Sequence, residues 1–124
     1  QTNYAQWSRL VTSLCHYFYD NQNFYRRIFS HHCSINALAE KIIKENIAQL
    51  VGLILEDMLQ TEHVSFTADY SHFITNIFTQ AIFGEVETWI NHLEPLQPEK
   101  EAQYMIMFIQ DTMNGVRTRT PNTI

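Results

Sequence analysis

The stretch that decides the fold is Thr67–Leu93, whose sequence is TADYSHFITNIFTQAIFGEVETWINHL. No charged residue occurs in it from Tyr70 to Gly84. Its apolar side chains recur at three- and four-residue steps, which is the spacing of a helix that buries one face. A solvated helix normally carries Lys and Glu on its other face, so we expect this helix to be covered on two sides, by its own core and by a second copy of the chain. The polar but uncharged residues on that other face are His72, Thr75, Asn76, Thr79 and Gln80.

A second apolar segment occurs at 104–109, where six consecutive residues read YMIMFI. One packed face of a helix cannot bury six consecutive apolar residues, so this helix also needs cover on two faces. We therefore expect the last two helices of two chains to form an intermolecular four-helix bundle with a self-complementary, two-fold interface. The side chains expected in that dimer interface are Ile82, Val86, Trp89, Ile90, Met105, Phe108 and Ile109.

The rest of the chain follows the same helical spacing, with no predicted strand. Thr67 suits the N-cap of the fourth helix, and Pro98 suits the first position of the fifth. Gly52, in the middle of the third helix, suggests a close approach by a neighbouring element. The predicted fold is an all-α bundle of five helices, with residues 1–116 as a single domain and 117–124 as a frayed tail. The predicted helices span Asn3–Asn21, Phe24–Ser30, Ile35–Gln60, Thr67–Leu93 and Pro98 to about Gly115.

Composition argues against several classes of protein. The chain has 124 residues, a net charge of -5 and a pI near 5.6, which argues against a nucleic-acid-binding surface on this segment. No run of about 18 apolar residues is present, so we expect no membrane span. No signal peptide is visible. We expect Cys15 and Cys33 to be reduced and the protein to be cytoplasmic, because a chain with a core of this size does not need a disulfide.

The sequence His31-His32-Cys33 has the composition of a metal site but not its spacing. Adjacent residues point apart, whereas zinc ligands must converge on one ion. Cys15 and His16 could approach these residues after folding, but no second ligand cluster is present in the sequence. We expect a polar corner between helices here, with no metal and no cofactor.

No residue pattern predicts an enzyme. Cys15 or Cys33 could pair with a histidine as nucleophile and base, but no local signature supports such a pair. Four acidic residues occur as two pairs at i, i+2, where side chains on a helix do not face each other, so we expect them to be solvated. These acidic residues are Glu85, Glu87, Glu99 and Glu101.

Two interpretations remain open for an aromatic cluster near the first turn, which comprises Tyr17, Phe18, Tyr19, Phe24, Tyr25 and Phe29. The cluster is either ordinary core packing or the wall of a cavity between the first, third and fourth helices. Asn46 falls on the apolar stripe of the third helix, and a buried amide needs a hydrogen-bond partner, which is either a neighbouring helix or a ligand. Thr75 and Thr79 carry the same two interpretations.

Two segments resemble the TetR family of transcriptional regulators. Residues 19–29, YDNQNFYRRIF, resemble a family segment in which an acidic and Asn-containing turn precedes Phe-Tyr and basic residues. Residues 83–90, FGEVETWI, followed by a break and Pro98-Glu99, are similar to the penultimate helix of that family and the start of its last helix. The likeness spans about residues 3–116.

The resemblance implies the ligand-sensing and dimerisation domain of a repressor. In that family a separate N-terminal helix-turn-helix domain binds operator DNA, and the last two helices form the dimer. Nothing ahead of Trp7 resembles that domain and the chain begins at Gln1, so we expect the N-terminal part to be missing. An effector bound between helices is expected to shift the first helix and so release the operator. The residues expected to contact a small-molecule effector are Cys15, Phe18, Tyr19, Asn46, Thr75, Phe78 and Thr79.

Two rival hypotheses remain. A helical protein–protein interaction module without a small-molecule ligand would use the same apolar surface for a different protein and would be a monomer when alone. A small metal- or thiol-dependent enzyme would use Cys15, Cys33 and neighbouring histidines.

Overall fold

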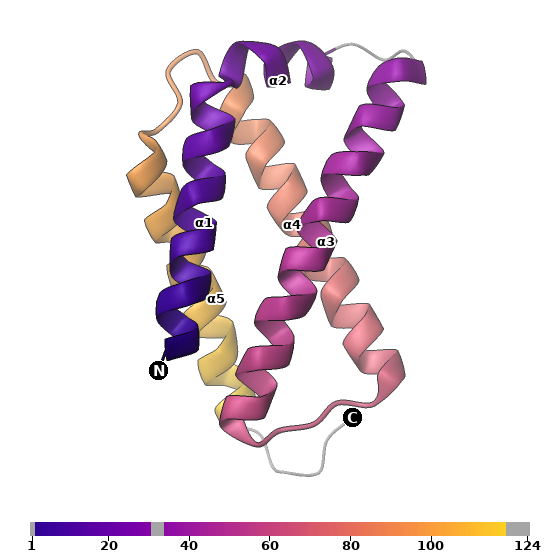
Figure 1. The fold of residues 1–124 in the computed structure, drawn as a ribbon, viewed down its shortest axis with the longest axis vertical. Helices are drawn as coiled ribbons and strands as arrows, with labels where there is room; N and C mark the ends of the chain where they lie inside the picture. The colour runs from indigo at the N-terminus through magenta and orange to yellow at the C-terminus, as the bar shows by residue number, and fades with distance from the viewer. Residues whose placement is uncertain (1, 31–33, 119–124) are drawn as a thin grey trace.

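The structure is a computed structural model that describes residues 2–30 and 34–118. Within these ranges it contains five α-helices and no strand, which confirms the predicted all-α class. Each predicted helix is present with ends shifted by only a few residues, and Gly115 does not end the last helix. The helices are α1 (Thr2–Asp20), α2 (Gln22–Ser30), α3 (Ser34–Glu62), α4 (Ala68–Asn91) and α5 (Pro98–Arg117) (Figure 1).

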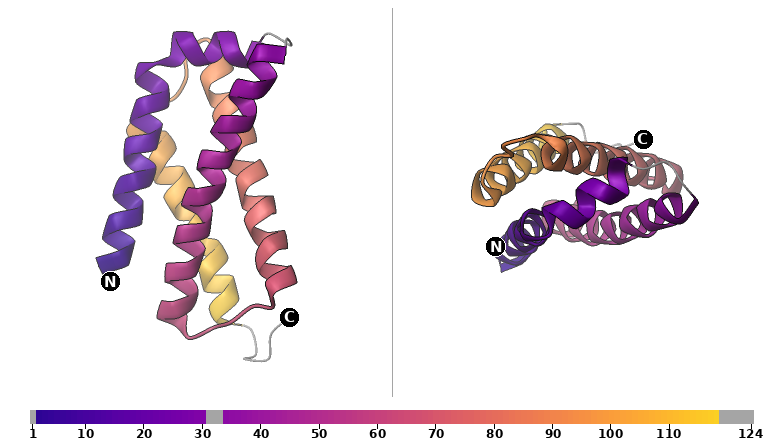
Figure 2. Two further views of the ribbon diagram at one scale, coloured as in Figure 1. Left: turned by 45° about the vertical axis from the view of Figure 1, so that its right-hand side comes forward. Right: turned by 90° about the horizontal axis from the view of Figure 1, so that it is seen from above.

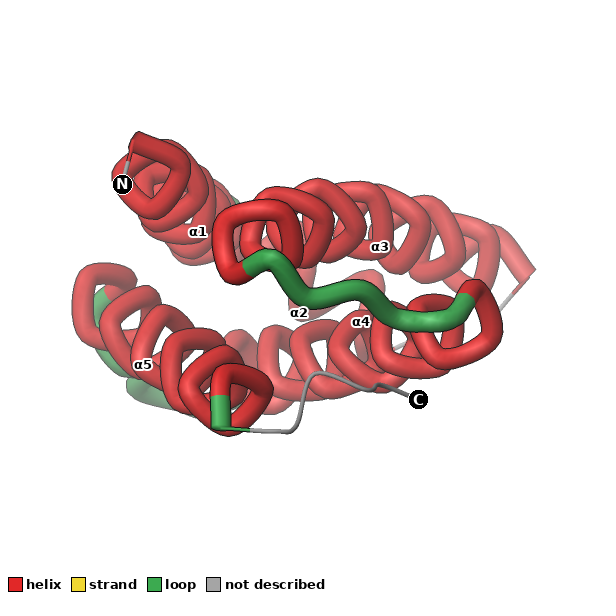
Figure 3. Tube along the Cα trace, turned by 90° about the horizontal axis from the view of Figure 1, so that it is seen from below, coloured by secondary structure: helices red, strands yellow, loops and turns green. Residues whose placement is uncertain are grey.

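The four long helices form two layers. α1 and α3 lie in one layer and α4 and α5 in the other, while the short α2 crosses one end of the bundle (Figures 2 and 3). The most extensive helix contacts are those of α1 with α5 and of α3 with α4, so each helix of one layer packs on its counterpart in the other. The core lies between the layers, and the outer side of each layer is left without cover in a single chain.

The helical stripe of α1 shows how sequence spacing builds this core. Trp7, Val11, Cys15 and Phe18 recur at three- and four-residue steps, and all four are buried. The rest of the core cluster comes from the other four helices. They include Tyr25, Ile28 and Phe29 of α2, Ile47, Val51 and Ile54 of α3, Phe83, Val86 and Ile90 of α4, and Ala102, Met105 and Ile109 of α5.

Helix ends follow the predicted capping chemistry in part. The Thr67 hydroxyl accepts a hydrogen bond from the Tyr70 N–H at 3.1 Å, and Pro98 is the first residue of α5. At Asn21 the side chain and the backbone serve different helices. The side-chain amide donates to the Tyr17 carbonyl at 2.9 Å, whereas the Asn21 backbone carbonyl accepts the first bonds of α2. One residue therefore ends α1 and begins α2.

Three expectations need correction or lie outside the described residues. A Cβ added at Gly52 would meet no atom within 4 Å, so no neighbour approaches the backbone closely there. Asn46 is exposed on α3, so its amide is solvated and not buried as the sequence stripe indicated. The expected corner at 31–33 lies outside the described residues, as do residues 119–124 of the expected tail.

Candidate functional site: the outer face of α4 and α5

The outer face of the α4/α5 layer carries large apolar side chains that the single chain does not cover. Phe108 is 52% exposed, and Phe78 packs edge-on against it with ring centroids 5.7 Å apart. At the start of α4, the rings of Tyr70 and Phe73 form a continuous aromatic row with Phe66 of the preceding loop. We define the α4/α5 outer face by its exposed residues Phe73, Ile77, Ala81, Tyr104, Met107 and Phe108.

A groove of about 410 Å³ runs between α4 and α5 on this side. Its walls are mainly apolar, and the only charged side chains that line it are two carboxylates, Glu85 from α4 and Glu101 from α5. The complete lining is Ala81, Ile82, Glu85, Leu96, Glu101, Tyr104, Met105, Phe108 and Ile109.

Glu101 is the buried acid of the groove. It lies in the first turn of α5 and is only 3% exposed, which contradicts the expectation that it is solvated. Burial, together with a hydrogen bond and charge repulsion from the Glu85 carboxyl, raises the pKa of Glu101 to about 8. Two carboxyl groups can share a hydrogen bond only when one of them holds a proton. The pair therefore carries one proton at neutral pH.

Cys15 is buried beside Met105, which lines the groove. The thiol is buried and its Sγ lies 3.8 Å from the Met105 sulfur. Burial, and then the negative charges of Glu101 and Glu85, raises the pKa of Cys15 to about 12. A nucleophilic cysteine needs a lowered pKa, so Cys15 lacks the property that the thiol-enzyme hypothesis requires. Cys33 lies outside the described residues.

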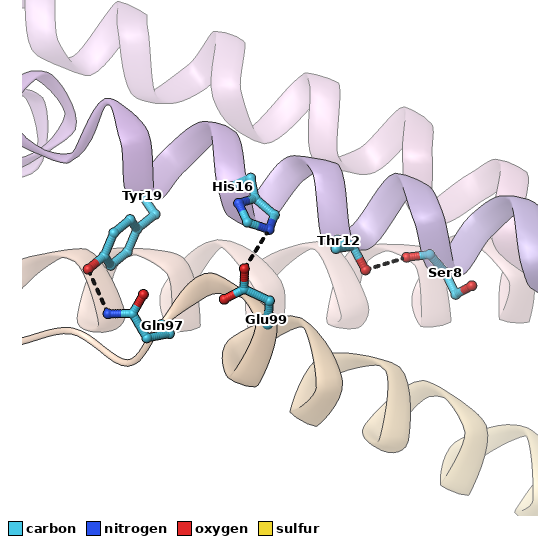
Figure 4. Close-up of polar contacts among 6 residues, drawn as sticks. All are labelled: Ser8, Thr12, His16, Tyr19, Gln97 and Glu99. Carbon is cyan, nitrogen blue, oxygen red and sulfur yellow. Dashed lines mark hydrogen bonds and ion pairs between the residues drawn. The ribbon is translucent and has the colours of Figure 1, made fainter.

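Polar contacts join α1 to the start of α5 along one flank (Figure 4). His16 Nε2 lies 3.2 Å from a Glu99 carboxylate oxygen, and the Gln97 amide donates to the Tyr19 hydroxyl at 3.1 Å. The Tyr19 ring also stacks on Trp89, whose indole N–H donates to the Leu96 carbonyl at 2.9 Å. The turn between α4 and α5 is therefore fixed to α1.

Arg26 of α2 fixes the other side of this turn. Its Nε donates to the Ile90 carbonyl at 2.7 Å, and one terminal nitrogen donates to the His92 carbonyl at 2.8 Å and to the Gln22 side chain at 3.0 Å. Sequence analysis did not single out Arg26. Arg26 and Arg27 are adjacent, and which of them reaches α4 depends on how α2 crosses the bundle.

The seven residues expected to contact an effector do not share a single cavity among those described. Tyr19 lines a polar cavity of about 560 Å³ at the α1–α2 turn, Phe78 lines a small gap among α3, α4 and α5, and Thr75 lines a third cavity. Cys15 and Phe18 are buried in the core. Thr79 is also buried, and its hydroxyl donates to the Thr75 carbonyl at 2.7 Å.

The third cavity has a volume of about 400 Å³ and lies where α3 ends and α4 begins. Leu55, Ile74 and Phe66 supply apolar surface, and Gln60 and Thr75 supply polar groups. This volume is within the range of small-molecule sites, and such a mixed lining is typical of them.

The seven residues expected at the dimer interface divide into two groups. Five of them are buried within a single chain, because α3 and α2 pack on α4 and α1 packs on α5: Val86, Trp89, Ile90, Met105 and Ile109. Ile82 is half-buried at the groove, and Phe108 is exposed. The surface that a partner can reach is therefore a different stripe of the same two helices.

The described part of the chain, residues 2–30 and 34–118, offers neither a membrane-spanning helix nor a set of metal ligands. No helix there is long and apolar enough to cross a membrane. No group of three or more His, Cys, Asp or Glu side chains there could hold a metal ion.

Comparison with known proteins gives a family match. Residues 5–111 match the TetR-type family model described as "Transcriptional regulator C-terminal region". No curated protein and no solved structure matches the chain. The matched residues run from the first turns of α1 into the second half of α5, so they include both layers and the groove.

Proposed function

This chain belongs to the TetR-type family of transcriptional regulator C-terminal regions, and from that premise we propose that it is the dimerisation and effector-sensing domain of a cytoplasmic repressor. The proposed role is not enzymatic. DNA binding is assigned to a separate N-terminal helix-turn-helix domain joined ahead of α1, and dimerisation to the α4/α5 outer face.

The observation that carries this proposal is the uncovered α4/α5 outer face. Tyr104, Met107 and Phe108 are each about half exposed, and aromatic residues and Met are enriched at protein interfaces. On α4 the outer face also lacks charge from Tyr70 to Gly84. A second copy would bury the same stripe from both chains, which is the arrangement of a two-fold interface.

The contacts between α1 and α5 support a coupling role. His16, Cys15 and Tyr19 of α1 contact Glu99, Met105 and Gln97, respectively. A shift of α1 must therefore break these contacts or move α5 with it. An effector acts on this system only if it binds one arrangement more tightly than the other.

For the effector we favour the cavity of about 400 Å³ between α3 and α4, because Thr75 lies in its wall. Its mixed lining suits a small molecule with both an apolar and a hydrogen-bonding part. The contributions of Cys15, Phe18, Tyr19, Asn46, Phe78 and Thr79 to effector binding stay a prediction.

The test of the proposed function is the mass of the native particle, measured by light scattering at several protein concentrations. A mass of two chains supports a dimerisation domain. A mass of one chain at every concentration contradicts it and favours the interaction module, in which the same face receives a different protein.

A further inference from the structure

The groove between α4 and α5 places a titratable pair at the centre of an apolar surface. Glu101 is buried at the base of the groove, whereas Glu85 is exposed at its edge. Around them lie Ile82, Tyr104 and Phe108, which are apolar or aromatic. Any partner that covers these rings must also cover Glu85.

No basic side chain neutralises the pair in the described part of the chain. The titratable groups near it are the buried Cys15 thiol from α1 and the Tyr104 side chain of α5, which lines the same groove. On the flank toward α1, Glu99 is paired with His16, and on the outer side Lys100 lies over the Tyr104 ring, 5.9 Å from its centroid. Among these groups, neither carboxyl of the pair has an ion-pair partner.

We propose that the Glu85–Glu101 pair makes self-association through the α4/α5 outer face dependent on pH, with the dimer favoured while the pair holds its proton. This inference rests on the proposed dimerisation function. It assigns to the groove a regulatory role that a purely apolar interface would not have.

The physical reason is that dimerisation removes the water that stabilises the charged pair. In the single chain the pKa of Glu101 is about 8, raised first by burial and then by Glu85. A second copy over the groove removes water from both carboxyl groups, and burial disfavours the charged form of a carboxyl group. The dimer then binds the proton more tightly than the single chain does, so loss of the proton and dissociation are linked.

Linkage sets the size of the effect. Each proton released on dissociation changes the dissociation constant by up to about tenfold per pH unit above the pKa of the single chain. A two-fold dimer contains two pairs, so the limit is about one hundredfold per pH unit.

The experiment is sedimentation velocity of the whole chain from about pH 7 to about pH 9 at constant ionic strength. We expect the dimer dissociation constant to rise at least about tenfold over this range. Glu101→Gln keeps the size and hydrogen-bonding capacity of the side chain but cannot ionise. The dimer dissociation constant of this variant is therefore expected to change little over the same pH range. Glu99→Gln, two residues away and exposed, is the matched control and is expected to keep the wild-type pH dependence.

The outcomes separate this inference from the function on which it rests. A wild-type dimer whose dissociation constant does not change with pH overturns the inference alone, as does a pH dependence that persists in Glu101→Gln. A single chain at both ends of the range overturns the dimerisation function itself. If Glu101→Gln does not fold, Glu85→Gln tests the same pair at an exposed position, and an unchanged pH dependence in that variant overturns the inference.

Discussion

Arg26 ties α2 to the end of α4 through two hydrogen bonds. The carbonyls of Ile90 and His92 lie at the C-terminal end of α4, where backbone acceptors have no partner within the helix. A cation placed there also interacts favourably with the helix dipole. Arg26 therefore satisfies two carbonyls and holds the α4–α5 turn, from which the α5 half of the groove begins.

Replacing Arg26 tests this arrangement. Arg26→Ala is expected to lower the free energy of unfolding by about 2 kcal/mol, because hydrogen bonds from a charged group to carbonyls are lost. Arg27→Ala is the control, since Arg27 is exposed and its change should stay within about 0.5 kcal/mol. Urea unfolding measures both variants. Equal effects of the two substitutions would mean that the contacts of Arg26 add nothing to stability.

The raised pKa of Glu101 makes the free energy of unfolding depend on pH. Its pKa is about 8 in the folded chain, raised mainly by burial, against 4.5 for an ordinary glutamate. Between these values the folded state binds more protons than the unfolded state, so stability is lost as the pH rises from about 4.5 through about 8.

Glu101→Gln removes this titration. The variant is expected to unfold at a higher temperature than the wild type at about pH 9, and to lose that advantage at about pH 5. Thermal unfolding at a fixed protein concentration measures the difference, because association also changes the midpoint. A variant that is less stable than the wild type at about pH 9 would show that the charged carboxylate is well accommodated.

At the scale of single helices, the spacing of apolar side chains predicted the features that depend on one helix alone. The five helices, the Thr67 cap and the Pro98 start follow from side-chain period and terminal chemistry. Spacing did not predict which apolar stripe of α5 enters the core, because that choice depends on α1. Met105 packs toward α1 and Ile109 toward α3, and both are buried, which leaves Phe108 exposed.

The candidate site was predictable only in outline. The uncharged segment of α4 and the continuous apolar run of α5 indicated that both helices need a second cover. The pairing of Glu85 with Glu101 was not visible, because 16 positions separate them and only the packing of α4 beside α5 brings them to one groove. The prediction that Asn46 is buried was wrong, because Asn46 lies at the edge of the apolar stripe of α3 and faces solvent.

Gly52 gives a prediction at the scale of one helix. A Cβ at this position of α3 meets nothing within 4 Å, and alanine is preferred over glycine inside a helix by about 1 kcal/mol. Gly52→Ala is therefore expected to raise the free energy of unfolding by about that amount. Gly115→Ala, near the end of α5 where helices fray, should gain less. Urea unfolding compares them, and a destabilised Gly52→Ala would reveal an unseen contact at this position.

The whole molecule has two outer faces with different character. Both expose apolar side chains, and on the α1/α3 side these include Leu10, Leu38 and Leu53. The α4/α5 side combines such residues with a groove of about 410 Å³ and an uncharged stretch of α4. α1 lies directly against α5, so this face is connected to the helix that leads toward the N-terminus (Figure 1).

The assignment of the dimer to this face is the central claim, and a pair of variants tests it most directly. Phe108→Glu places a charge on the α4/α5 outer face, and Leu53→Glu places the same charge on α3, where the side chain is 61% exposed. Sedimentation velocity at about pH 7 is expected to give one chain for Phe108→Glu and two chains for Leu53→Glu and the wild type. The opposite pattern, or a Phe108→Glu variant that stays dimeric at the wild-type dissociation constant, would contradict the account.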